Sequence, residues 1–246
     1  MLGLYAMYGF GYGYGYRGFY FDKTYILVLI GVVISLIASA KVKSTYQRYS
    51  RVQSLSGMTG AQAADQILRN AGIYDVRIQR VSGHLTDHYD PRNKTLNLSD
   101  SVFNSTSVAA IGVAAHEVGH AIQDARHYVP LKFRNSFVPV ANFGSTLSWP
   151  LILIGLLLGG SNTLITIGII LFSFAVIFQL VTLPVEFNAS GRAIRILSDT
   201  GILRGDEISH TRKVLGAAAL TYVAAAATSI LQLLRLIILF GGRNRD

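Results

Sequence analysis

The chain has 246 residues, of which 51% are apolar and 14% are charged, and its formal net charge at pH 7 is +9. Its mean hydropathy of +0.40 favours a protein embedded in a bilayer over a water-soluble domain. Because the chain has no cysteine, disulfides and thiolate metal ligands are excluded. The basic residues form no single run, so the positive charge does not indicate nucleic-acid binding.

The N-terminal part consists of a low-complexity tail and a first apolar stretch. Residues 1–23 are rich in glycine and tyrosine, which is typical of a tail that lies at the lipid headgroups. Residues 24–40 carry no charge and predict a short first transmembrane helix. This stretch ends in Ala38-Ser39-Ala40, which also resembles a signal-peptide cleavage site. Lys41 and Lys43 follow at once and oppose translocation, which favours an uncleaved helix.

The polar segment 41–134 is long enough for a compact module. Its patterning predicts a helix capped by Thr59, a strand within 74–81, a strand–turn–strand unit within 87–99, and a helix from about Ser105 to Arg126. We therefore expect a small β-hairpin or sheet beside helices in this module.

The longest uncharged run, 135–185, has room for two transmembrane helices. We place them at 143–160 and 163–183, folded at the small polar break "GGSN". A second polar segment follows at 184–213, and a last transmembrane helix at 214–240.

The basic residues near the ends of these helices predict the orientation. Twelve of them lie in the segments 41–134 and 186–213, against five on the other side. The positive-inside rule then places both segments in the cytoplasm. The predicted fold class is a mainly α integral membrane protein of the cell (inner or plasma) membrane, with about four transmembrane helices.

Residues 114–124, "AAHEVGHAIQD", contain the spacing H-E-x-x-H. Residues i and i+4 of a helix share one face, so His116 and His120 converge on one metal ion. Glu117 lies beside that face and can take a proton from a metal-activated water. Gly119 allows another backbone or the substrate to approach closely. This pattern predicts a zinc site, which normally needs a third protein ligand.

Two known sources of a third ligand do not fit the chain. Metzincins need a glycine at position 123 and a histidine at 126, where this sequence has Gln123 and Arg126, and His127 is out of register. Intramembrane site-two proteases use an aspartate from a later span, but none of the later uncharged stretches contains one.

Glu186 is the third ligand that the topology favours. Two spans separate it from His120, so the chain returns to the same side of the membrane. A carboxylate at a membrane boundary is costly without a partner, and zinc could be that partner. The alternative is that Glu186 is an ordinary glutamate at the membrane interface and binds no metal. Glu207 is a weaker candidate, because Asp206 and Lys213 indicate a solvated helix start.

The stretches "AAHEVGHAIQDA", "LPVEFNASGRAIRIL" and "AALTYVAAAAT" resemble the YugP-type neutral zinc metallopeptidases of bacterial membranes. The layout is more distantly similar to the HtpX and CAAX-prenyl-protease group of gluzincins. The resemblance implies that His116, His120 and Glu186 bind zinc and that Glu117 is the general base. The wider group usually has an aspartate four residues after the ligand glutamate, where this chain has Ser190. A supporting role for Ser190 or Asn188 follows from that comparison.

Substrate contacts are less defined by the sequence. The stretch "KTLNLS", with Leu96 and Asn97, predicts either an edge strand that pairs with a peptide or a structural hairpin. Peptide hydrolysis also needs a hydrogen-bond donor for the developing oxyanion, and the candidates are Arg192, Arg195, His210 and Tyr128. His84 and His88 flank the predicted strands and are expected to be structural, with support of the site as the alternative.

The resulting hypothesis is a membrane-bound zinc metalloendopeptidase that acts on membrane proteins or misfolded segments. Its expected partners are the lipid bilayer and protein or peptide substrates, not nucleic acid. The rivals are a zinc-binding membrane protein without hydrolytic activity, such as a sensor, scaffold or transporter, and an adaptor that uses the Gly/Tyr tail. A transporter is expected to carry ionisable groups in mid-span, and the uncharged stretches contain none.

Overall fold

The computed structural model describes residues 22–241, so the predicted tail at 1–23 lies almost wholly outside the described residues. This part of the chain forms seven α-helices and one three-stranded sheet. In chain order the elements are α1 (Tyr25–Tyr49), α2 (Gly60–Asn70), β1 (Arg77–Val81), β2 (His88–Asp90), β3 (Thr95–Ser99), α3 (Asp100–Phe103), α4 (Val108–Ala125), α5 (Val129–Leu157), α6 (Asn162–Asp199) and α7 (Asp206–Phe240).

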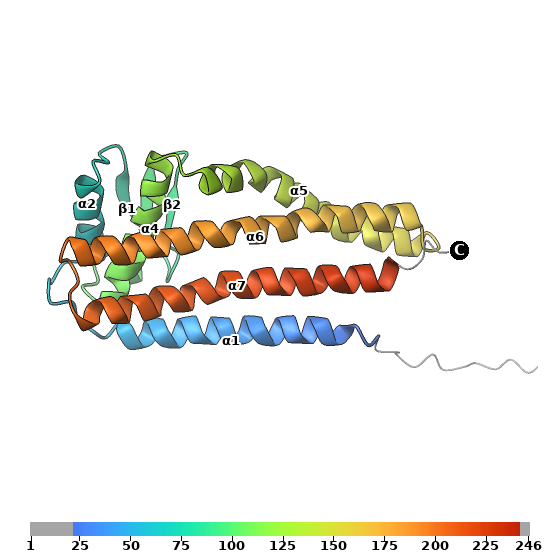
Figure 1. Ribbon diagram of the computed structural model, residues 1–246, viewed down its shortest axis with the longest axis horizontal. Helices are drawn as coiled ribbons and strands as arrows, with labels where there is room; N and C mark the ends of the chain where they lie inside the picture. The colour runs from blue at the N-terminus through green and yellow to red at the C-terminus, as the bar shows by residue number, and fades with distance from the viewer. Residues whose placement is uncertain (1–21, 242–246) are drawn as a thin grey trace, which may run out of the picture.

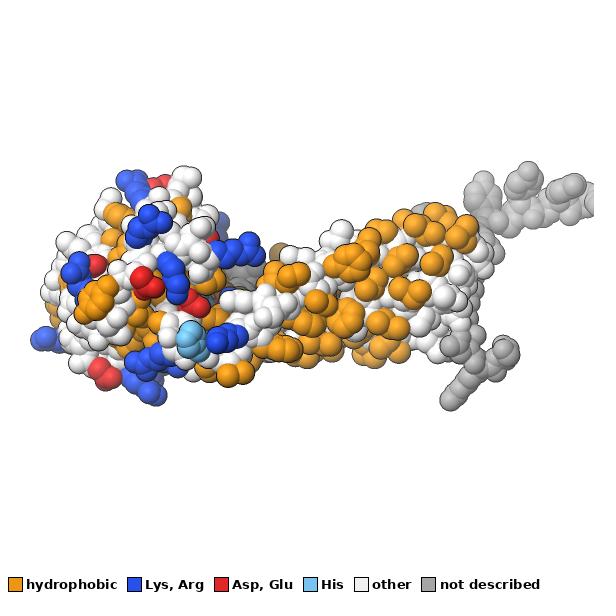
Figure 2. Space-filling view, turned by 90° about the horizontal axis from the view of Figure 1, so that it is seen from above, with side chains coloured by type: hydrophobic (Ala, Val, Ile, Leu, Met, Phe, Trp, Pro, Cys, Tyr) orange, Lys and Arg blue, Asp and Glu red, His pale blue; other side chains and the backbone are white. Residues whose placement is uncertain are grey.

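Four helices, α1, α5, α6 and α7, are long and apolar enough to cross a membrane. Their most apolar windows have mean hydropathies between 1.5 and 2.6, and no more than 28% of any window is buried within the protein. They lie along one another in an elongated bundle (Figure 1). Apolar side chains cover this half of the molecule, while charged side chains gather on the head at the other end (Figure 2). The chain is therefore a mainly α integral membrane protein, as predicted.

The membrane helices run on into the head. The 38 residues of α6 extend about 57 Å, whereas the hydrocarbon core of a bilayer is about 30 Å thick. The surplus length carries α6 past the predicted span at 163–183 and into contact with α4. At the far end of the bundle, Gly159 and Gly160 both have positive φ, and they form the turn between α5 and α6 at the predicted break.

Helix α4 lies at the centre of the head, against α2, α6 and α7. Ser107 caps it by accepting a hydrogen bond from Ala110 N at 3.2 Å, so the helix begins at Val108, slightly later than predicted. Most of its side chains are buried, including Ile111, Val118 and Ile122. The motif therefore belongs to a well-packed helix of the head, which holds its side chains in fixed positions.

The sheet has the order β1-β3-β2, with β3 parallel to β1 and antiparallel to β2. Of the two alternatives predicted for "KTLNLS", the structural hairpin is confirmed and the edge strand is wrong. This stretch forms β3, the central strand, whose backbone is already paired on both sides. Leu96 is fully buried there, and the Asn97 side chain donates to Thr95 Oγ1 at 3.1 Å. The edge strand that lies against α4 is β2.

A glycine lets α6 approach α4. A Cβ atom added at Gly119 would lie 2.8 Å from the carbonyl oxygen of Ala189, closer than side chains tolerate. Of the two partners predicted to approach this residue, another backbone or the substrate, the structure shows a backbone, that of α6. This contact sets the distance between the motif helix and the segment that contains Glu186.

Candidate metal centre

Three potential ligands converge between α4 and α6. His116 and His120 stand one turn apart on α4, and Glu186 faces them from α6. Glu186 Oε2 lies 3.3 Å from His116 Nε2 and 3.5 Å from His120 Nε2. The three ligand atoms all lie within 4.8 Å of one another, and they form a group that could hold a metal ion.

The surroundings of these atoms fit a divalent metal. Glu186 is 4% exposed, and its Oε2 has no hydrogen-bond partner despite its burial. A buried carboxylate oxygen without a partner is costly, and a cation at this point would remove that cost. Two imidazoles and one carboxylate are a ligand set that suits catalytic zinc. Burial opposes protonation of His120, but the carboxylates of Glu186 and Glu117 outweigh it and raise the pKa of this imidazole.

Gln123 holds His120 in one orientation. Its amide nitrogen donates to Val185 O at 2.8 Å and to Asn188 Oδ1 at 3.0 Å, which leaves its oxygen facing His120 Nδ1 at 3.0 Å. His120 Nδ1 therefore carries a proton, which leaves Nε2 as the nitrogen that would bind a metal. This is the tautomer that a metal ligand needs.

Ser190 orients the imidazole of His116, as Gln123 orients that of His120. Its hydroxyl lies 3.1 Å from His116 Nδ1. Ser190 stands where the wider group of gluzincins usually has an aspartate, and a hydroxyl can accept the same hydrogen bond. Asn188 acts one step further away, through Gln123. Arg192 donates to Asn188 Oδ1 at 2.7 Å, so it lies behind the centre and not in it.

Arg134 fixes the second oxygen of Glu186. Its Nη1 lies 3.0 Å from Glu186 Oε1, and the side chains are 24% and 5% exposed. Arg134 is the last charged residue before the uncharged run 135–185, and Glu186 is the first one after it. The two ends of the α5–α6 hairpin therefore meet in an ion pair at the membrane boundary, with only Oε2 left toward the histidines.

Glu117 lies beside the centre and against the sheet edge. Its Oε2 accepts a hydrogen bond from Tyr89 N at 3.1 Å. The Tyr89 hydroxyl donates to Asp124 Oδ2 at 2.9 Å, so β2 is tied to α4 at two points. Burial, followed by the hydrogen bond and charge of Asp124, raises the pKa of the Tyr89 hydroxyl above its usual value. That hydroxyl therefore stays protonated and keeps its hydrogen bond.

A cavity of about 170 Å³ opens onto this centre. Its walls come from β2 and the residues around it, from α4, and from the three membrane helices α5, α6 and α7. The lining residues are Asp87, His88, Tyr89, Pro91, Glu117, His120, Leu131, Arg134, Asn135, Glu186 and Tyr222. Glu117 and two of the potential ligands thus share one partly enclosed space with the sheet edge.

The weaker ligand candidates lie elsewhere. Glu207 is buried, but its oxygens accept from Leu55 N at 2.7 Å and Arg204 N at 2.8 Å, so it ties two loop segments to the first turn of α7. His127 has a positive φ in the turn after α4. Among residues 22–241, no other group of three potential ligands comes together.

The residues named as oxyanion donors are also placed outside the cavity. Arg192 and Arg195 line a separate pocket between α2, α4 and α6. Tyr128 packs under the Arg192 guanidinium, whose carbon is 5.9 Å from the ring centroid, and His210 stacks on Tyr49. His84 packs edge-on against Tyr46, as expected of a structural histidine. His88 alone of the two flanking histidines lines the cavity.

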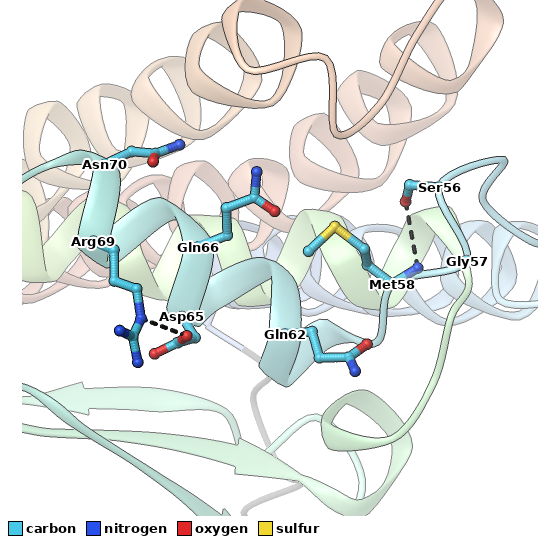
Figure 3. A pocket seen from close by; sticks show the side chains of 8 residues that line it. All are labelled: Ser56, Gly57, Met58, Gln62, Asp65, Gln66, Arg69 and Asn70. Atoms are coloured by element: carbon cyan, nitrogen blue, oxygen red, sulfur yellow. Dashed lines mark hydrogen bonds and ion pairs between the residues drawn. The ribbon is translucent and has the colours of Figure 1, made fainter.

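A further pocket lies on α2 and the loop before it (Figure 3). Its charged side chains, Asp65 and Arg69, pair with each other at 2.8 Å, and Ser56 Oγ accepts from Met58 N. The side chains drawn there include no histidine and no unpaired carboxylate. This pocket therefore lacks the groups that hydrolysis needs.

Sequence reasoning did not identify Gln123, Arg134 or Tyr222 as part of the site. Gln123 is a buried polar residue three positions after His120, and that spacing was a usable signal. The sequence indicates Arg134 only as one of the basic residues that set the topology, although it flanks the uncharged run that Glu186 closes. Tyr222 lies within an apolar stretch, where its sequence gives no sign of a functional role.

Comparisons with known proteins agree with these features. Over residues 24–241 the chain matches a family described as "Putative neutral zinc metallopeptidase". It is 49% identical over 221 residues to the "Putative membrane protease YugP" of Bacillus subtilis (strain 168), an alignment that covers 89% of the chain and 98% of that relative. No solved structure matches the chain. The chain therefore belongs to the family of neutral zinc metallopeptidases, as its motifs predicted, and it is a membrane-embedded member.

Proposed function

We propose that the protein is a zinc endopeptidase of the gluzincin type, with His116, His120 and Glu186 as metal ligands. The observation that carries this proposal is the buried Glu186 Oε2, which has no hydrogen-bond partner and faces two imidazole nitrogens at 3.3 and 3.5 Å. The matched family adds zinc as the expected metal.

Glu117 is the proposed general base. Zinc in this position supplies a Lewis acid that acidifies water and polarises a carbonyl group. Glu117 Oε2 is held by Tyr89 N, so Oε1 is the oxygen that takes the proton of the attacking water. Glu117 then delivers this proton to the leaving amine. Gln123 and Ser190 keep both imidazoles in the neutral tautomer that binds a metal throughout these steps.

We propose β2 as the strand along which a peptide substrate lies. In an antiparallel pair, the backbone groups of alternate residues point away from the partner strand. Tyr89 N points to Glu117, so Tyr89 is the residue of β2 whose backbone faces away from β3. Because the Tyr89 N–H is already donated to Glu117, a peptide bound here by β-augmentation would pair through the Tyr89 carbonyl and pass directly beside the general base.

The same proposal includes the orientation in the cell. The head carries most of the basic residues near the membrane boundary, which supports a cytoplasmic head by the positive-inside rule. The ion pair of Arg134 and Glu186 lies at the end of the uncharged run, so the active site borders the bilayer. Membrane proteins, or unfolded segments close to the membrane, are the substrates that such a site would reach.

Removal of the metal tests the proposed activity. The purified protein in detergent is expected to cleave fluorescein-labelled casein, to lose this activity with 1,10-phenanthroline, and to regain it with added zinc. The reason is that Glu117 alone cannot generate a nucleophile from water near pH 7. Activity that persists after complete zinc removal would contradict the proposal. Tightly bound zinc without cleavage of any substrate would favour the zinc scaffold.

The orientation can be tested by cysteine labelling, because the natural chain has no cysteine. Ser161→Cys lies at the far end of the bundle, in the turn between α5 and α6, and Ser56→Cys lies in the head. In intact cells, a membrane-impermeant maleimide is expected to label position 161 only. Position 56 is expected to react once the membrane is opened. Labelling with the opposite preference would place the head outside the cytoplasm.

A further inference from the structure

The oxyanion of peptide hydrolysis needs a hydrogen-bond donor, and the donors named from the sequence lie outside the cavity. The donor therefore has to come from the residues that line the cavity itself. His120 is a proposed ligand, and the Tyr89 hydroxyl already donates to Asp124. Apart from these two, four of the lining residues carry a nitrogen or oxygen that can donate: His88, Arg134, Asn135 and Tyr222.

Two of these four are already engaged. His88 Nδ1 lies 2.9 Å from Thr86 O, and its Nε2 lies 3.2 Å from Asn97 Nδ2, so neither ring nitrogen is available. Arg134 holds Glu186 Oε1 at 3.0 Å and also contacts Asn135 Oδ1. Moving Arg134 to a substrate would release a buried carboxylate, which is unfavourable. Asn135 and Tyr222 remain.

Tyr222 reaches the centre from α7, at the same depth as Glu186. Glu186 lies 13 residues before the end of α6 in the head, and Tyr222 lies 16 residues after the start of α7 there. At about 1.5 Å per residue, these positions are about 20 and 24 Å from the head ends of the helices. Tyr222 lines the same cavity as Glu117, His120 and Glu186. It is therefore placed beside both the proposed ligand and the proposed base.

We infer that Tyr222 donates its hydroxyl proton in a hydrogen bond to the oxyanion that forms from the scissile carbonyl. This inference rests on the proposed peptidase function and adds a catalytic residue to it. Tyr222 lines the cavity in which the reacting carbonyl would lie, beside Glu117 and Glu186. Its hydroxyl is the donor that this position offers to the reacting oxygen. No bond to Tyr222 forms or breaks, and its proton stays on the phenol.

Tyr222→Phe tests this assignment, with Tyr46→Phe as the matched control. Tyr46 is buried, and its hydroxyl donates to Ser101 O at 3.1 Å, but it does not line the cavity. For casein cleavage, kcat of Tyr222→Phe is expected to fall by about 10²–10³-fold with KM changed by less than about threefold. Zinc per chain is expected to match the wild type. The control is expected to keep kcat, with some loss of thermal stability.

A second readout requires no turnover. A peptide phosphonamidate carries tetrahedral oxygens like those of the reacting carbon, and its binding can be followed by the shift in thermal unfolding. Tyr222→Phe is expected to weaken this binding by at least about tenfold, because one charge-assisted hydrogen bond is lost. Unchanged kcat and unchanged phosphonamidate binding would overturn the inference, and so would a parallel loss of zinc and activity. A wild type that neither cleaves casein nor binds the phosphonamidate would refute the peptidase proposal itself.

Discussion

Glu117→Gln is expected to abolish casein cleavage, with a loss of kcat of about 10²–10⁴-fold, while the protein keeps its zinc. The amide retains an oxygen that can accept the hydrogen bond from Tyr89 N, so β2 stays in place. It cannot accept the proton of the attacking water, and this is the step that fails. Activity is measured as kcat on labelled casein, and zinc is measured by elemental analysis of the same preparation.

Glu207→Gln is the matched control for this variant. Glu207 is also buried, but its oxygens accept from Leu55 N and Arg204 N at the start of α7, outside the cavity. Its replacement is expected to lower stability modestly and leave kcat unchanged. A Glu117→Gln protein that cleaves casein at the wild-type rate would refute the role of Glu117. Such a result with zinc still bound would also favour a non-catalytic zinc protein.

Arg134→Met is expected to lower the free energy of unfolding of the metal-free protein by about 3–5 kcal/mol. It leaves the buried carboxylate of Glu186 without its 3.0 Å partner. The loss is expected to be smaller with zinc, because a metal on Oε2 compensates the same negative charge. The rise in unfolding temperature caused by zinc is therefore larger in this variant than in the wild type. Thermal unfolding in detergent, with and without zinc, measures both effects.

Arg134→Lys separates charge from geometry. A lysine keeps the positive charge but not the planar guanidinium, so an intermediate loss is expected. Equal destabilisation of Arg134→Met with and without zinc would contradict the account, because it would mean that zinc and Arg134 do not act on the same carboxylate.

The sequence was sufficient to predict the class of fold. The uncharged stretches gave four membrane helices, and the positive-φ glycines at 159 and 160 form the predicted turn. The lengths of the helices were harder to predict from the sequence. Charge marks where a helix leaves the bilayer but not where it ends, so α6 continues to Asp199 through a polar segment.

The order of the strands could not be read from local patterns. The β2–β3 hairpin follows from its turn, but β1 pairs with the outer side of β3 through contacts distant in sequence. That pairing buries Leu96 and Asn97 and makes β2 the edge. Similarly, the H-E-x-x-H spacing predicted that the two histidines share one helix face. The even number of spans predicted that Glu186 lies on their side of the membrane. Arg134 and Tyr222 reach the cavity only through the packing of α5 and α7.

The central claim is that one zinc ion is held by His116, His120 and Glu186. Zinc per chain, measured side by side on purified wild type, Glu186→Ala and Glu207→Ala, tests it most directly and requires no substrate. We predict about one zinc per chain in the wild type and in Glu207→Ala, and a large loss in Glu186→Ala, because two imidazoles alone bind zinc weakly. Full zinc occupancy in a folded Glu186→Ala protein would contradict the account.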